Sequence, residues 1–233
     1  MRLRKKPWAR PELEACEFFV TNPTDYIGKW QNIFGNTNEI WVELGCGKGG
    51  FTSKLASSNP DKNFIAIDIK DEVLILAKQK IEKEYAANNL NTNNIRLMAH
   101  EIMLIHKILN EKDVVNRIFI NFCNPWHKNT HGTRRLTHPN QLKQYKVFLA
   151  PLGQIWFKTD DDILFNASVR YFEKCDFKIS FLTEDLHGSN FSENIMTEHE
   201  KMYAEQGHKI KFLIAQKNAC SLRQTCILGT RDI

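Results

Sequence analysis

The sequence predicts an α/β domain built on a mostly parallel sheet with helices on both faces. Short apolar, β-favouring runs alternate along the chain with segments of helical periodicity, which is typical of strand–helix–strand units. A glycine-dense loop follows the first of these runs, at the place where such sheets hold ligands. A length of 233 residues suits one well-buried domain, and no linker-like stretch divides it. We expect a basic leader, residues 1–35, packed on a domain that spans residues 36–233.

Composition excludes several classes of protein. Hydrophobic residues make up 42% of the chain and charged residues 25%, as in an ordinary globular protein. There is no run of about eighteen apolar residues, so we expect no membrane span. The six cysteines form neither a Cys-x-x-Cys pair nor a cluster with histidines. We therefore expect a cytoplasmic protein with reduced thiols and no bound metal.

The formal net charge of +5 is unevenly spread. The first ten residues contain five cations and no acid: Arg2, Arg4, Lys5, Lys6 and Arg10. No apolar segment follows them, so this is not a secretory signal. Such a run is either solvated surface or an arm that contacts phosphates.

The first strand is predicted at residues 40–44 and leads into a loop that contains Gly45, Gly47 and Gly50. Glycines allow a sharp turn and let backbone amides approach a ligand closely. Their spacing also fits dinucleotide-binding loops, and a purely structural turn is a further alternative. Glu43, at the end of the strand, would repel a pyrophosphate and favour a cation. It therefore favours S-adenosyl-L-methionine, which carries amino and sulfonium groups.

The later elements follow the same alternation. The next strand, residues 63–68, ends in Asp68, where folds of this kind place a carboxylate on ribose hydroxyls; a helix cap is the alternative. Glu101 follows the third strand. Further strands are predicted at residues 95–99, 117–122, 153–159, 177–182 and 209–215, and helices at 51–58, 71–89, 103–109, 139–149 and 164–174. Residues 216–233 have no pattern that we can assign.

Three polar segments are candidates for substrate contacts. Residues 121–138 combine a Pro125–Trp126 corner with cations at 128, 134 and 135, which suits stacking and phosphate contacts with a nucleic acid; a solvated loop is the alternative. Residues 160–162 are three successive acids that can cap the next helix or face a substrate. Thr197 and Glu200 fit a capping box as well as a functional role.

With these motifs in place, the sequence resembles the bacterial tRNA (guanine-N(7)-)-methyltransferases over roughly residues 1–215. The glycine loop is shared by many methyltransferases, but the other motifs are specific to this family. The matching segments are the leader with Arg2, Arg4, Lys5, Lys6 and Trp8; residues 42–49; Asn121, Phe122, Pro125, Trp126 and Lys128; His131 with residues 134–136; residues 157–160; and residues 194–200.

The resemblance implies a Rossmann-like seven-stranded S-adenosylmethionine-dependent methyltransferase fold. It implies methyl transfer from S-adenosyl-L-methionine to the 7-nitrogen of a guanine in the tRNA variable loop, by a monomer or homodimer. The implied methyl-donor site comprises Glu43, Gly45, Gly47, Asp68, Glu101 and Asn124. The implied substrate site comprises Lys128, Asp160, Thr197, Glu198, His199 and Glu200.

The candidate catalytic residue, Asn124, departs from the family pattern, in which an Asp precedes the Pro-Trp. Glu101 likewise stands where an Asp is usual, and His127 replaces a usual Pro. The 7-nitrogen of guanine carries a lone pair and no proton, so attack on the methyl group needs no general base. Alignment alone can supply much of the rate, and an amide can hold a ligand by hydrogen bonds. We therefore expect in-line transfer by positioning.

Three alternatives stay open. The Asn-Pro-Trp corner also fits an amino-methyltransferase that acts on a nucleobase, although the match at residues 128–136 speaks against it. The Asn124 change is also consistent with a tRNA-binding relative that has lost catalysis. A nicotinamide oxidoreductase fits the glycine spacing but is disfavoured by Glu43.

Overall fold

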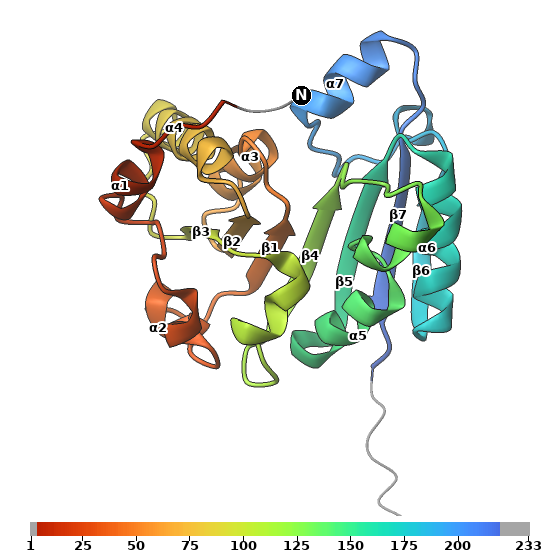
Figure 1. Ribbon diagram of the computed structural model, residues 1–233, viewed down its shortest axis with the longest axis horizontal. Coiled ribbons are helices and arrows are strands. Elements are labelled where there is room, and N and C mark those ends of the chain that lie inside the picture. The colour runs from red at the N-terminus through yellow and green to blue at the C-terminus, as the bar shows by residue number, and fades with distance from the viewer. Residues whose placement is uncertain (1–3, 220–233) are drawn as a thin grey trace, which may run out of the picture.

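A computed structural model describes residues 4–219 and contains a seven-stranded sheet with helices on both faces (Figure 1). The strand order is β3-β2-β1-β4-β5-β7-β6. All pairs from β3 to β5 are parallel, whereas β7 runs antiparallel to both β5 and β6. The strands are β1 (Ile40–Leu44), β2 (Asn63–Asp68), β3 (Ile95–Ala99), β4 (Val115–Asn121), β5 (Leu149–Thr159), β6 (Phe177–Thr183) and β7 (Lys211–Lys217). This confirms the predicted fold class.

Helices connect the strands. The α-helices are α1 (Ala9–Glu14), α2 (Trp30–Phe34), α3 (Gly50–Ser57), α4 (Asp71–Ala87), α5 (Pro139–Phe148), α6 (Asp162–Lys174) and α7 (Glu198–Glu205). Short 3-10 helices are η1 (Pro23–Tyr26), η2 (Ile102–Lys107), η3 (Asn129–Arg134) and η4 (His187–Ser189). Within residues 4–219, none of these helices combines the length and apolarity needed to cross a membrane.

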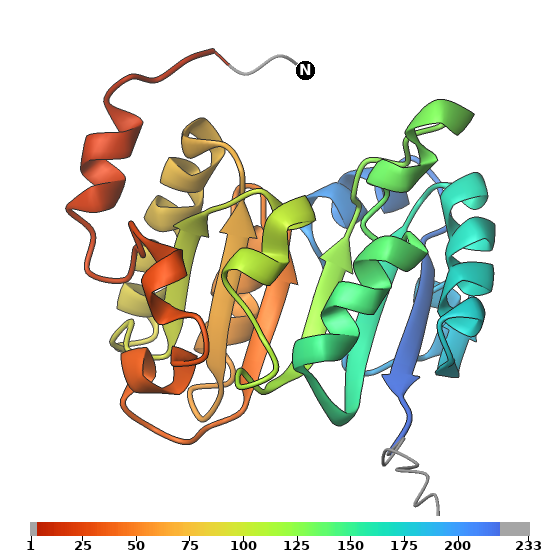
Figure 2. The same cartoon turned by 60° about the horizontal axis from the view of Figure 1, so that its bottom comes forward.

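Successive side chains of each strand point to opposite faces of the sheet and feed two cores. Val42, Ile118 and Ile155 belong to the core shared with α2, α5 and α6, which Figure 2 shows in front of the sheet. Trp41 and Phe119 belong to the core shared with α1, α3 and α4. Both faces of the parallel strands are therefore buried, which explains why their sequences are almost continuously apolar.

The segment before β1 is attached to the sheet by buried aromatic side chains. Phe18, Phe19, Trp30 and Phe34 are all buried, and the Trp30 indole N–H donates to the Ile108 carbonyl at 2.7 Å. α1 packs against α4. Arg10 ion-pairs with Asp71 at 3.0 Å. Although the first ten residues contain no acid, Arg10 is therefore paired with an acid from a later part of the chain.

One predicted helix takes a different form. Residues 103–109 were expected to form an α-helix, but the structure has the shorter 3-10 helix η2, interrupted at Leu104 with φ −106° and ψ 25°. The Leu104 carbonyl lies 3.0 Å from the His100 imidazole Nε2, so a side chain takes the place of a helical N–H. Of the tail that we could not assign, residues 220–233 lie outside the described residues.

Candidate active site

The glycine loop, residues 45–50, connects the end of β1 to α3. Gly45, Gly47 and Gly49 adopt positive φ angles of 82°, 54° and 72°, which favour glycine. At Gly49 a Cβ atom would lie 2.7 Å from the Ala77 Cβ, so the close packing of the loop on α4 requires glycine. The three positive φ angles and the close approach of Gly49 to Ala77 therefore determine the shape of the loop and hold it against α4.

Asp68, at the end of β2, contacts the glycine loop through its carboxylate. Its Oδ2 accepts a hydrogen bond from the Gly47 N–H at 3.0 Å. Its Oδ1 accepts from the Ile69 N–H at 2.7 Å and the Lys70 N–H at 3.2 Å. The carboxylate is half-buried at the carboxyl edge of the sheet, next to the loop. Its predicted contact with a ribose stays a prediction.

Glu43 is a buried carboxyl group at the end of β1. It accepts hydrogen bonds from the Thr52 hydroxyl and from the Asn121 Nδ2, the latter at 3.0 Å. Burial raises the pKa of Glu43 to about 7, although these hydrogen bonds and the positive charge of Lys158 act in the opposite direction. A cation bound beside Glu43 would favour its ionised form.

A pocket of about 370 Å³, here called the edge pocket, opens over the carboxyl edge of the sheet. The glycine loop, the end of β4 and the first turns of α7 form its walls. It is lined by Glu43, Gly45, Cys46, Gly47, Lys48, Gly50, Phe51, Asn121, Phe122, Thr197, Glu198, His199 and Met202. Among the described residues, no group of His, Cys, Asp and Glu is suited to hold a metal ion.

The structure brings part of the predicted site together. Predicted residues that line the edge pocket are Glu43, Gly45, Gly47, Thr197, Glu198 and His199. Predicted residues outside this lining are Asp68, Glu101, Asn124, Lys128, Asp160 and Glu200. Glu101 is exposed after β3 and Lys128 is exposed in the loop after β4. The roles assigned to both groups stay predictions.

α7 is anchored through a buried ion pair. The Lys158 Nζ lies 3.1 Å from the Glu200 Oε2, and Glu200 is completely buried. The other oxygen, Oε1, accepts from the Asn194 Nδ2 at 2.7 Å and lies 2.8 Å from the His187 Nε2. Thr197 and Glu200 also form the predicted capping box. Glu200 thus holds α7 in place over the pocket.

The pKa values of the two partners reflect this arrangement. Burial lowers the pKa of Lys158, and the nearby Glu200 carboxylate only partly offsets that effect. For Glu200, burial tends to raise the pKa, but the Lys158 charge and the hydrogen bonds outweigh burial and lower it. The lowered pKa of Glu200 keeps its carboxylate ionised near neutral pH, where it faces the Lys158 Nζ at 3.1 Å.

The first turn of α7 makes further contacts above the sheet edge. The His199 ring lies 4.6 Å from the Phe122 ring and stacks 4.3 Å from the Tyr203 ring. Its Nε2 is 3.8 Å from the Asp160 carboxylate at the end of β5. Glu198 forms an ion pair with Lys80 of α4. α7 therefore bridges the ends of β4 and β5 to α4.

The loop after β4 carries the Asn-Pro-Trp corner. Asn124 is exposed, and its Oδ1 accepts from the Trp126 N–H at 3.1 Å. Arg135 is buried, and it donates to the carbonyls of Pro125 at 2.8 Å and Trp126 at 3.3 Å. The expected phosphate contact of Arg135 is therefore wrong, because this guanidinium holds the corner instead. Arg134 lies over the Trp126 ring, 5.2 Å from its centre.

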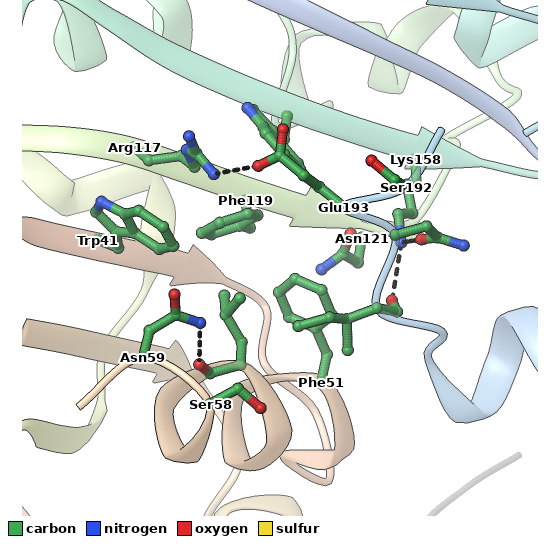
Figure 3. A pocket seen from close by; sticks show the side chains of 14 residues that line it. Trp41, Phe51, Ser58, Asn59, Arg117, Phe119, Asn121, Lys158, Ser192 and Glu193 are labelled. Carbon is green, nitrogen blue, oxygen red and sulfur yellow. Dashed lines mark hydrogen bonds and ion pairs between the residues drawn. The ribbon is translucent and has the colours of Figure 1, made fainter. Parts of the chain in front are cut away.

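A second pocket of about 310 Å³, the face pocket, lies on the sheet between α3 and residues 192–195 (Figure 3). The Arg117 guanidinium lies between the rings of Trp41 and Trp156, at 4.3 and 4.2 Å from their centres. The face pocket and the edge pocket share Phe51 and Asn121. Aromatic faces and two cations, Arg117 and Lys158, thus continue the site along the sheet.

Sequence reasoning missed three side chains of the site. Thr52, Asn121 and Lys158 were not proposed, although they contact Glu43 or anchor α7. A signal existed for two of them, since Asn121 and Lys158 belong to the motifs after the fourth and fifth strands. Side chains at strand ends point toward the carboxyl edge, where ligands bind.

Comparisons with known proteins agree with this geometry. Solved structures with the same fold include the 16S rRNA methyltransferase KamB, with TM-score 0.58 and 11% identity, covering 82% of this chain and 93% of that one. They also include a precorrin-6y C5,15-methyltransferase from Geobacter metallireducens, with TM-score 0.51 and 14% identity, covering 80% and 85%. The fold and the glycine loop define a Rossmann-like S-adenosylmethionine-dependent methyltransferase.

Sequence relatives narrow the class. Residues 37–213 match the family described as "Putative methyltransferase". A tRNA (guanine-N(7)-)-methyltransferase from Acetivibrio thermocellus is 73% identical over 217 residues, covering 93% of this chain and all of the relative. The Clostridium beijerinckii protein of the same name is 62% identical over 218 residues, covering 94% and 100%. The chain belongs to the tRNA (guanine-N(7)-)-methyltransferase family.

Proposed function

We propose that this protein transfers the methyl group of S-adenosyl-L-methionine to the 7-nitrogen of a guanine in the variable loop of tRNA. The edge pocket carries the proposal, because a buried carboxyl group and a glycine loop meet there at the end of β1. The names of the relatives that are 73% and 62% identical supply the reaction and the tRNA substrate. Because its substrate is tRNA, we place the protein in the cytoplasm.

The residues present fit a cationic methyl donor. Glu43 is the only carboxyl group in the lining that is buried beneath the glycine loop, among residues 4–219, and a cation would stabilise its charged form. The amides of Gly45 and Gly47 would approach the ligand, and Asp68 would accept hydrogen bonds from the ribose. Glu101, after β3, would accept from the adenine. When bound, this ligand supplies a methyl group that its sulfonium already activates.

For the acceptor, positioning suffices, because the 7-nitrogen needs no deprotonation. Asn121 separates the edge pocket from the face pocket and donates to Glu43 at 3.0 Å, so it aligns the carboxylate beneath the donor. Asn124 uses its Oδ1 within its own loop. Its Nδ2 makes no hydrogen bond within residues 4–219 and is free to hold the base or the donor.

Substrate contacts divide into two groups. Lys128 lies in the loop after β4 and Asp160 directly follows β5, on the side where the base would enter. Thr197, Glu198 and His199 line the edge pocket and would face the ligands. For Glu200 we propose an indirect role, because its buried carboxylate positions α7 and lines neither the edge pocket nor the face pocket.

Incubation with radiolabelled S-adenosyl-L-methionine and unmodified tRNA tests the proposal. Label in tRNA, with strand scission after borohydride and aniline at one variable-loop guanine, is the expected result. Label on an exocyclic amine would identify an amino-methyltransferase. Binding of donor and tRNA without transfer would identify a relative that has lost its reaction.

A further inference from the structure

Four lysines from three helices line one hollow beside the edge pocket. Lys54 of α3, Lys80 and Lys83 of α4, and Lys201 of α7 surround a cavity of about 260 Å³. This hollow and the edge pocket share Gly50, Thr197 and Glu198 as lining residues. These lysines are hereafter called the lysine cluster.

Among the described residues, three of the four lysines in the cluster form no ion pair, and the hollow has more lysines than acids in its lining. Lys80 is paired with Glu198, and Glu84 is the other acid that lines the hollow. Lys54, Lys83 and Lys201 are exposed and form no ion pair with any carboxylate in residues 4–219. Like charges held this close repel one another, and they raise the local concentration of a polyanion.

The leader adds cations to the same side of the molecule. Arg4, Lys5 and Lys6 precede α1, and α1 packs on α4, the helix that carries Lys80 and Lys83. Figure 1 shows the chain before α1 running past α4 in the direction of α7. The leader cations therefore belong to a segment that is attached to the helix carrying Lys80 and Lys83.

We propose that the lysine cluster binds the phosphate backbone of the tRNA strand that leads into the edge pocket. This inference rests on the proposed function. The hollow contains no aromatic ring on which a base could stack, since its non-lysine lining is Gly50, Ser53, Glu84, Met196, Thr197 and Glu198. Ammonium groups contact phosphates as point charges and carry no base recognition. The lysine cluster therefore supplies affinity, whereas the edge pocket selects the base.

A charge-matched pair of variants tests the lysine cluster. Lys54→Gln/Lys83→Gln/Lys201→Gln removes three exposed, unpaired lysines of the cluster. Lys143→Gln/Lys174→Gln/Lys178→Gln removes three exposed lysines of α5, α6 and β6, which also form no ion pair within residues 4–219. Both variants lose three positive charges, so a difference in their tRNA affinity depends on where the lysines lie and not on net charge. The measurement is tRNA affinity by fluorescence anisotropy between low and moderate salt.

The cluster variant makes fewer phosphate contacts, so fewer counterions are released when it binds tRNA. Its slope of log affinity against log salt should therefore be shallower by about 2. Its affinity for tRNA should fall about tenfold or more at low salt, with KM for tRNA raised and single-turnover transfer at saturating tRNA unchanged. The control variant should keep the wild-type slope. Affinity for S-adenosyl-L-methionine should be the same in all three proteins, which also verifies folding.

Equal loss of slope in the two variants would overturn the inference, because net charge rather than position would be responsible. A cluster variant with the salt slope and the KM for tRNA of the wild-type protein would overturn the inference as well. In either case, methylation of tRNA by the wild-type protein would still support the proposed function. If the wild-type protein neither binds nor methylates tRNA, the proposed function fails and the inference fails with it.

Discussion

The Lys158 ammonium lies 3.1 Å from the Glu200 carboxylate, and their side chains are only 4% and 0% exposed. Lys158 is near the end of β5 and Glu200 is in the first turn of α7, so the pair fastens a wall of the edge pocket to the sheet. Burying two charges is costly unless each is fully hydrogen-bonded. Glu200 meets that condition through Asn194, His187 and Thr197, and Lys158 does so by donating to the Asn194 Oδ1 and the Ile195 carbonyl.

Breaking this pair should strongly destabilise the protein. Lys158→Met leaves the Glu200 carboxylate buried without its cation, which should cost about 3–5 kcal/mol in the free energy of urea unfolding at pH 7. Adding Glu200→Gln to Lys158→Met should recover part of this loss, because no unpaired charge remains.

The pH dependence gives a second check on the same pair. Because folding lowers the pKa of Glu200, the stability from its ionised form is present above its ordinary value of 4.5 and is lost as pH falls through the folded value. The stability gap between wild type and Lys158→Met should therefore narrow in acid. A single variant as stable as wild type at pH 7, or a gap that is constant with pH, would contradict the pairing.

Glu43 should make donor binding depend on pH. Its pKa of about 7 is raised by burial, so ionisation destabilises the free protein increasingly between pH 4.5, its ordinary value, and about 7. A cationic ligand offsets that cost. Affinity for S-adenosyl-L-methionine should therefore rise by up to about tenfold from pH 6 to 8, and Glu43→Gln should remove this rise.

Calorimetry at several pH values measures the effect. The amino group of the ligand titrates in the same way whichever protein is present. The difference between the two curves of affinity against pH therefore gives the contribution of Glu43 ionisation. Parallel curves for wild type and Glu43→Gln would show that Glu43 does not bind the cation.

Asp68 should contribute to donor affinity directly and through the loop. Asp68→Ala removes the acceptor for the Gly47 amide and the expected ribose partner, so affinity should fall by about 1–3 kcal/mol. Asp68→Asn keeps a neutral acceptor and should lose less. A folded Asp68→Ala protein with unchanged affinity in calorimetry would rule out the ribose assignment.

The leader should strengthen tRNA binding through the cations that precede α1. Because Arg10 is paired with Asp71 and Ala9 begins α1, the informative deletion removes residues 1–6 only. It should weaken tRNA binding and flatten its salt dependence, without affecting donor affinity. Identical salt slopes with and without residues 1–6 would mean that this run is ordinary solvated surface.

The sequence predicted local elements better than distant partnerships. The bounds of β1, β2 and β3 match the predicted strands because each apolar run ends at a turn or a strand-end acid. The burial of Glu200 and Arg135 was not predictable, because a polar residue carries no local sign of a distant partner. Lys158, the partner of Glu200, is 42 positions away in the chain.

The antiparallel direction of β7 was likewise hidden in the sequence. An apolar run of this kind forms a parallel or an antiparallel strand equally well, and the direction depends on the connection that precedes it. Here the connection after β6 contains η4 and α7, and it returns the chain along β5 in the opposite direction. The same connection supplies the α7 wall of the edge pocket.

Asn124 should act by positioning rather than by proton transfer. The wild-type protein should methylate guanine in tRNA, and its single-turnover rate should show no ionisation of residue 124 between about pH 6 and 9, since an amide does not titrate there. Asn124→Ala removes both the free amide nitrogen and the Oδ1 contact with the Trp126 N–H, and should slow transfer roughly ten- to a thousandfold.

Asn124→Asp separates positioning from chemistry. An aspartate keeps an oxygen for the Trp126 N–H, so the Pro125–Trp126 corner should hold its shape and transfer should continue. Single-turnover assays of the wild-type protein and both variants on one unmodified tRNA make the comparison. Suppose that wild type is inert on every unmodified tRNA while Asn124→Asp is active. A carboxylate would then be required for the chemistry, and this chain would be a tRNA-binding relative that has lost its reaction through one substitution.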